Sequence, residues 1–154
     1  KSLLGDERLM VSRVAENRRI LANLRETLEY QLQRGVAVLS ETRRSINELD
    51  IRLQALEATS LRILTAFDGG GEIGAEPSML KLKGSELVQA QDEVLFAMID
   101  YLALPLDTAT GGASVTPAWA EFVASGRYHH RGFTIAGGSS EVQHNIIAKQ
   151  VLGL

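Results

Sequence analysis

The chain has 154 residues, of which 45% are hydrophobic and 23% charged, and its formal net charge is −3. This is the composition of a soluble globular domain, and a mildly acidic chain lacks the basic field that nucleic-acid or anionic-membrane binding needs. The chain contains no cysteine, which excludes disulfides, thiolate metal sites and a cysteine nucleophile. No apolar run approaches the ~20 residues of a membrane span, so we expect one cytoplasmic domain without nucleic-acid or membrane partners.

Apolar residues recur at helical spacing in three long segments. The first, Asp6–Leu32, carries charged residues on its opposite face and can end at Gly35. The second, Leu39–Phe67, has a heptad seam in which steps of three and four alternate. The third begins at Pro77, a favourable first helical residue, and continues to about Leu104. Each segment predicts a helix.

The third segment contains two further features. Gly84 interrupts its apolar stripe and predicts the close approach of a neighbouring helix. Lys81 and Lys83 fit the solvated start of a helix better than a phosphate clamp.

Two shorter helices are predicted after the third long one. Thr116 and Pro117 resemble an N-cap and first helical residue, for a helix through Val123. An irregular stretch is expected over Arg127–Gly138. A capping-box pattern, S-x-x-Q from Ser140, then opens a last helix. Its apolar side consists of Val142, Ile146, Ile147 and Val151. Together the segments predict an all-α fold, an up-and-down four-helix bundle with a short extra helix.

The irregular stretch contains adjacent histidines, His129 and His130. Adjacent side chains point apart on a helix or a strand, and no acidic cluster is spaced to join them. We therefore expect ordinary polar loop residues and no metal site.

The last twenty residues carry the most informative pattern, I-A-G-G-S-S-E-V-Q-H-N-I-I-A-K-Q-V-L-G-L. Two glycines allow close approach of the backbone to another group, and hydroxyls follow at a helix N-terminus, where phosphate or ribose oxygens can bind. The same residues also suit an ordinary helix cap. A G-x-S-x-G nucleophile elbow is absent, so a serine nucleophile is not expected.

This segment resembles the C-terminal signature of the acyl-CoA dehydrogenase family, I-x-G-G-T-S-E-I-Q-R-N-I-I-A-x-x-x-L-G-L. The upstream run P-S-M-L-K-L-K-G-S-E, Pro77–Glu86, is similar to the lysine-containing helix of the same family domain. The resemblance implies that residues 1–154 form the C-terminal helical domain of a longer flavoenzyme, without its N-terminal helical and middle β-domains.

The resemblance also implies a chemistry, the α,β-dehydrogenation of an acyl-CoA thioester by FAD, which an electron-transfer flavoprotein reoxidises. The family segment that binds FAD corresponds to Gly138, Ser139 and Glu141. Ala136 and Gly137 correspond to positions beside the acyl-CoA substrate. As in the family, the domain is expected to associate into homo- or hetero-oligomers.

The catalytic base of the family occupies one of two places. The commoner place corresponds to Gly137, which has no acid. The other lies at the start of the first long helix in a pattern ending E-R, and G-D-E-R-L supplies Glu7 there. The alternative is that Asp6 and Glu7 only favour a helix N-terminus.

Two family elements are missing. L-Q-R-G, Leu32–Gly35, stands in place of R-x-x-F-G, and the Q-x-x-G-G element has no counterpart at Ala97–Leu104. These departures resemble relatives that work as mixed-subunit complexes. The alternative function is therefore a non-catalytic oligomerisation module or an inactive partner subunit.

Overall fold

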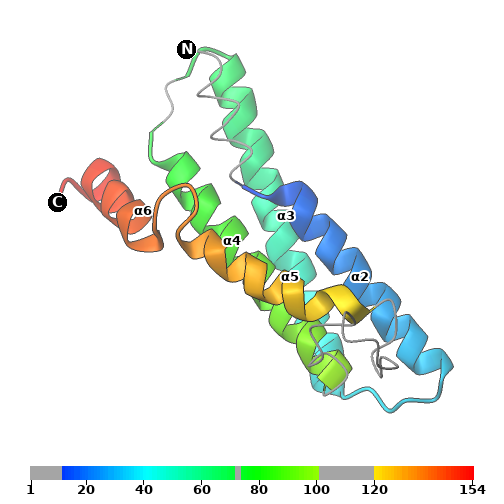
Figure 1. Ribbon diagram of the computed structural model, residues 1–154. Helices are drawn as coiled ribbons and strands as arrows, with labels where there is room; N and C mark the ends of the chain where they lie inside the picture. The colour runs from blue at the N-terminus through cyan, green and yellow to red at the C-terminus, as the bar shows by residue number, and fades with distance from the viewer. Residues whose placement is uncertain (1–11, 72–73, 101–119) are drawn as a thin grey trace.

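The structure, a computed structural model, describes residues 12–71, 74–100 and 120–154, and these contain helices and no strand (Figure 1). In chain order the elements are α2 (Val14–Gln33), α3 (Ser40–Asp68), α4 (Glu76–Ile99), α5 (Glu121–Arg131), the 3₁₀ turn η3 (Gly132–Thr134), α6 (Ser140–Ile147) and the π-helical turn η4 (Ala148–Leu152).

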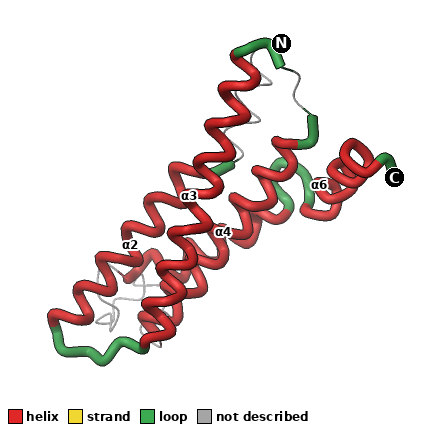
Figure 2. The backbone as a smooth tube through the Cα atoms, turned by 180° about the vertical axis from the view of Figure 1, so that it is seen from behind, coloured by secondary structure: helices red, strands yellow, loops and turns green. Residues whose placement is uncertain are grey.

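Helices α2 to α5 run up and down beside one another, and α6 projects at one end of the bundle, as Figures 1 and 2 show. Helix α4 is central, because it packs against α2, α3, α5 and α6. The main core is apolar and lies between these helices. Its buried members are Leu21, Leu24, Ile46, Leu49, Leu53, Leu56, Ile63, Leu80, Leu87, Leu95, Ile99 and Ala120. The expected fold class, an all-α four-helix bundle with a short extra helix, is confirmed.

The heptad seam of α3 forms the outer wall of this core. Its middle, from Ile46 to Ile63, is buried, whereas Leu39 and Phe67 at its ends are exposed. The ends therefore lie beyond the neighbours that cover the middle of the helix.

Within the described residues, α2 begins later than predicted and α4 agrees closely with its prediction. Helix α2 starts at Val14, after Arg13 in a left-handed conformation with φ +53°, and the predicted residues 6–11 lie outside the described part. Helix α4 starts at Glu76, with Pro77 in its first turn, and ends at Ile99; residues 101–104 are outside as well.

Gly84 confirms the predicted close approach, although its neighbour is not a helix. A Cβ atom here would lie 2.1 Å from the backbone oxygen of Ser12, in the segment just before α2. The glycine thus lets two backbones touch.

Two predictions about the last third were wrong. The helix expected to stop at Val123 continues to Arg131, so the irregular stretch expected from Arg127 is half helical. The buried positions of this region, Ala120, Ala124, His130 and Phe133, form no regular apolar stripe, and a histidine occupies one of them, so the sequence pattern does not show the helix. Residues 116 and 117 lie outside the described part.

The last helix also differs from its prediction. Ser139, not Ser140, is the N-cap, and the side chain of Ser139 accepts from the backbone N–H of Val142. The predicted apolar side is half open: Val142 is 49% exposed and Val151 65%, whereas Ile146 and Ile147 are half-buried. The fully buried side chain of the helix is Gln143. No helix of the described residues is long and apolar enough to cross a membrane.

Candidate functional site

The glycine pair of the C-terminal pattern forms a tight turn before α6. Gly137 and Gly138 have φ values of +74° and +96°, a left-handed region that favours glycine. The N–H of Gly138 donates to the carbonyl of Ile135 at 3.1 Å. A Cβ on Gly138 would lie 2.5 Å from Nε2 of Gln143, whereas Gly137 faces open space. The turn therefore needs Gly138 for both conformation and room.

Side chains of α6 fasten this turn to the helix. Gln143 Nε2 donates to the carbonyl of Gly137 at 3.0 Å, and the Ser139 hydroxyl caps the first turn. The pKa of the exposed Glu141 carboxyl group lies below its usual value. The main cause is a hydrogen bond from the backbone amide of Glu141 itself, and the next is a hydrogen bond from the Ser139 side chain. The positive end of the helix thus favours an anion at this point.

Lys81 reaches the same region from α4, and the expectation that it is solvated was wrong. Its side chain is 2% exposed, and Nζ donates to the carbonyl of Thr134 at 3.4 Å. Ser140 Oγ donates to the same carbonyl, also at 3.4 Å. Burial, and next the nearby Arg13, lower the pKa of Lys81. Lys83 is exposed as predicted and pairs with Glu86.

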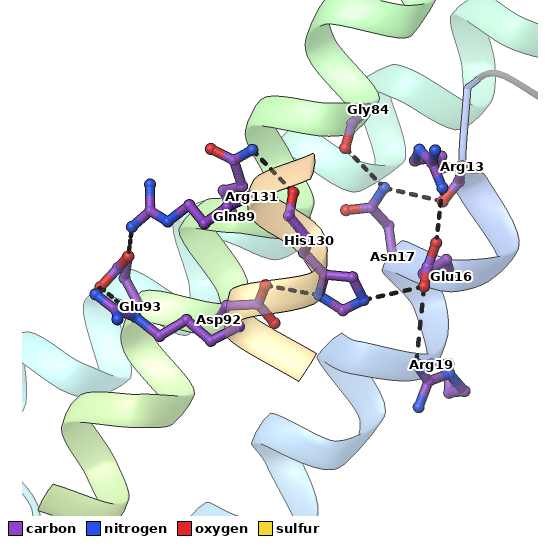
Figure 3. Close-up of polar contacts among 11 residues, drawn as sticks. Arg13, Glu16, Asn17, Arg19, Gly84, Gln89, Asp92, Glu93, His130 and Arg131 are labelled. Carbon is purple, nitrogen blue, oxygen red and sulfur yellow. Dashed lines mark hydrogen bonds and ion pairs between the residues drawn. The ribbon is translucent and has the colours of Figure 1, made fainter. Parts of the chain in front are cut away.

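The prediction that His130 is an ordinary loop residue was also wrong, because His130 lies in α5 and is buried between two carboxylates (Figure 3). Its Nδ1 lies 2.7 Å from Asp92 Oδ2 on α4, and its Nε2 lies 3.2 Å from Glu16 Oε1 on α2. Burial raises the pKa of Asp92, and the hydrogen bond with His130 opposes that effect. The carboxylates contact opposite ring nitrogens, and no group of three His, Cys, Asp or Glu in the described ranges could hold a metal ion.

The structure brings five of the six predicted site residues into one turn. These are Ala136, Gly137, Gly138, Ser139 and Glu141. The sixth, Glu7, lies outside the described residues. Glu141 is the one ionisable side chain among these five residues. The segment could therefore contribute to binding a ligand, but it has no carboxylate at position 137 that could act as a catalytic base.

Sequence reasoning missed His130, Asp92 and the buried state of Lys81, although a signal for the α4 residues existed. Helix α4 has a second helical stripe beside the apolar one that predicts the helix. That second stripe alternates steps of four and three and is buried throughout: Lys81, Ser85, Val88, Asp92, Leu95 and Ile99. A charged residue at such a position predicts a buried partner.

Comparison with known proteins finds no matching family model and no matching curated protein. The fold does match solved structures of the Tcur3481-Tcur3483 steroid ACAD, an acyl-CoA dehydrogenase, at a TM-score of 0.72 and 18% identity. A glycine-to-alanine variant of that protein matches at a TM-score of 0.74 and 19% identity. Each alignment covers 96% of this chain but 37% of the matched chain. The chain therefore folds as an acyl-CoA dehydrogenase-like helical domain, as its C-terminal pattern predicted.

Proposed function

We propose that the chain is the C-terminal domain of an FAD-dependent acyl-CoA dehydrogenase-like enzyme, which introduces an α,β double bond into an acyl-CoA thioester. The observation that carries the proposal is the family-like segment I-A-G-G-S-S-E-V-Q, in a fold similar to that of a steroid ACAD. The chain spans 37% of each matched chain, and the proposed site therefore includes groups that these 154 residues do not supply.

The residues at the start of α6 fit a flavin dinucleotide. The first N–H groups of a helix have no helical acceptor and favour phosphate and carbonyl oxygens. The open space at Gly137 allows a ligand to approach the backbone of the turn, and Ser139 and Glu141 supply polar side chains beside Gly138. Gly138, Ser139 and Glu141 would therefore hold FAD, which supplies the hydride acceptor when it is bound.

The proton-transfer part of the reaction is assigned to Glu7. A carboxylate base is needed to take the α-proton of the thioester, and Gly137 has no side chain that can serve. Ala136 and the open space at Gly137 would border the acyl chain. Because the matched proteins are named for steroids, steroid acyl-CoA thioesters are the first substrates to test, with an electron-transfer flavoprotein as the electron acceptor.

The test is Glu7→Gln in the full-length protein, with Asp6→Asn as the matched control. We expect Glu7→Gln to retain flavin, measured by visible absorbance, and to lower turnover by ~10²–10⁴-fold because a positioned base is lost. Gly137→Glu in the Glu7→Gln background should recover part of the activity. An unchanged rate in Glu7→Gln contradicts the assignment of the base.

The second candidate function is an inactive partner subunit in a mixed complex. Leu32–Gly35, in place of the family's R-x-x-F-G, favours it. This candidate predicts that the full-length protein binds a second, active subunit and shows no turnover alone. In that case Asp6→Asn and Glu7→Gln leave the activity of the complex equally unchanged.

A further inference from the structure

His130 connects three helices through one buried side chain. The ring binds Asp92 of α4 on one side and Glu16 of α2 on the other, while the residue itself belongs to α5 (Figure 3). Its backbone carbonyl also accepts from Gln89 Nε2 of α4 at 3.1 Å. Both the side chain and the main chain of His130 are therefore fixed.

The next turn of the chain continues this network. The rings of His130 and Phe133 lie 4.9 Å apart between centroids. Phe133 is buried against Ile20 and Val88, and the guanidinium of Arg13 lies 3.3 Å above its ring. Arg13 in turn pairs with Glu16, the carboxylate that binds His130. The network therefore closes around η3.

Thr134 follows and makes the connection to α6. Its carbonyl receives both the Lys81 ammonium and the Ser140 hydroxyl. Within α6 the buried side chain is Gln143, which binds Gly137, and Val142 is half exposed. Gln143 is the fully buried side chain of α6, and Ile146 and Ile147 are only half-buried, so polar contacts contribute to its position along with hydrophobic packing.

We propose that His130 is a positioning residue for the site at the start of α6. Its bonds to Asp92 and Glu16 hold η3 against the bundle, and η3 holds the Gly137–Gly138 turn where its backbone can bind a ligand. The identity of that ligand, FAD, rests on the proposed function, but the positioning role does not. A site fixed before binding loses less conformational entropy on binding.

The test uses the full-length protein and compares His130→Ala with His129→Ala, its exposed neighbour. The ring of His129 also lies 5.5 Å from that of Phe133, so this control removes an aromatic contact of the network and leaves the bonds of His130 to Asp92 and Glu16 in place. Amide hydrogen exchange is measured at residues 135–143 and, as an internal reference, at residues 46–63 of α3. We expect His130→Ala to speed exchange at the turn by ~10-fold or more and to leave α3 unchanged, since local opening is independent of global unfolding. The FAD dissociation constant should rise ~10-fold or more, and His129→Ala should change neither quantity.

Two replacements of Asp92 distinguish a positioning role of the His130 network from a general contribution to stability. Asp92→Asn keeps an oxygen that can accept from His130 Nδ1, so it should retain slow exchange and FAD affinity, whereas Asp92→Leu should lose both. If His130→Ala does not fold, Glu16→Ala replaces it, because Glu16 is partly exposed and its loss keeps the His130–Asp92 contact while removing the contacts of Glu16 with His130, Arg13 and Arg19.

The outcomes distinguish the two proposals. Turn exchange in His130→Ala equal to that in His129→Ala, or faster exchange throughout the chain including α3, overturns the positioning role. Failure of the wild-type protein to bind FAD overturns the proposed cofactor and leaves the exchange comparison valid.

Discussion

The α3 side of the bundle and the α5–α6 side are held by different forces. Helix α3 buries a regular row of leucine and isoleucine side chains, from Ile46 to Ile63. The region from His130 to Gln143 combines the apolar contact of Phe133 with Ile20 and Val88 with ion pairs and hydrogen bonds of His130 and Thr134 to α2 and α4. Apolar packing tolerates small shifts of one side chain relative to its neighbours. A hydrogen bond or ion pair is lost when one of its two groups moves away.

The energies explain this contrast. Burying a leucine contributes ~1.5–3 kcal/mol with no directional requirement. A hydrogen bond contributes ~0.5–1.5 kcal/mol net, but a buried group without its partner costs ~1–3 kcal/mol. The α5–α6 side is thus suited to a site that needs one defined geometry, and the α3 side is suited to a stable scaffold.

The largest stability effect is expected on the α3 side. Leu53→Ala removes a side chain that is 4% exposed and leaves a cavity in the main core. We expect a loss of ~2–5 kcal/mol in the free energy of unfolding, measured by urea denaturation. Leu61→Ala, on the same helix but 63% exposed, should stay within ~0.5 kcal/mol. Similar losses for the two variants would contradict the location of the core.

Alanine substitutions at two glycines should change the free energy of unfolding in opposite directions. Gly84→Ala drives a Cβ into the backbone oxygen of Ser12 and should cost ~1–3 kcal/mol. Gly126→Ala, inside α5, meets only Cε1 of His130 at 4.0 Å and should gain ~0.5–1 kcal/mol from helix propensity. Thermal unfolding of both variants checks the prediction, which fails if Gly84→Ala is neutral.

The smallest effect concerns pH and the α5–α6 side. Burial raises the pKa of Asp92 above its ordinary value of 3.8, so the folded state binds this proton more tightly than the unfolded chain does. The stabilising contribution is present at low pH and is lost as the pH rises from 3.8 through the raised folded pKa. Asp92→Asn lacks this titration.

We therefore expect the stability of Asp92→Asn relative to wild type to increase across that pH interval and then level off. Urea denaturation at a series of pH values measures this difference. A relative stability that decreased with rising pH would mean that ionisation of Asp92 stabilises the fold, contrary to the effect of burial.

The helical spacing in the sequence was enough to predict the bundle. The seam of α3 and the end of α2 near Gly35 follow from apolar periodicity and glycine chemistry, which are local. The five candidate residues around the start of α6 were also assigned from sequence, through their resemblance to a family pattern, and their role stays a prediction. The cap itself was assigned one residue late, because Ser139 and Ser140 are chemically equivalent and only the backbone angle distinguishes them.

The sequence by itself determined the class of the fold, its long helices and the segment that forms the candidate site. Only the tertiary structure decided that Lys81 is buried and that His130 joins Asp92 to Glu16. The physical reason is the range of the interactions. An apolar side chain is buried when it lies on the face of the helix that packs against the bundle, so the spacing of apolar residues within one segment is enough to predict it. A buried charge needs a particular partner, and here the partners lie 38 or more residues apart in the chain.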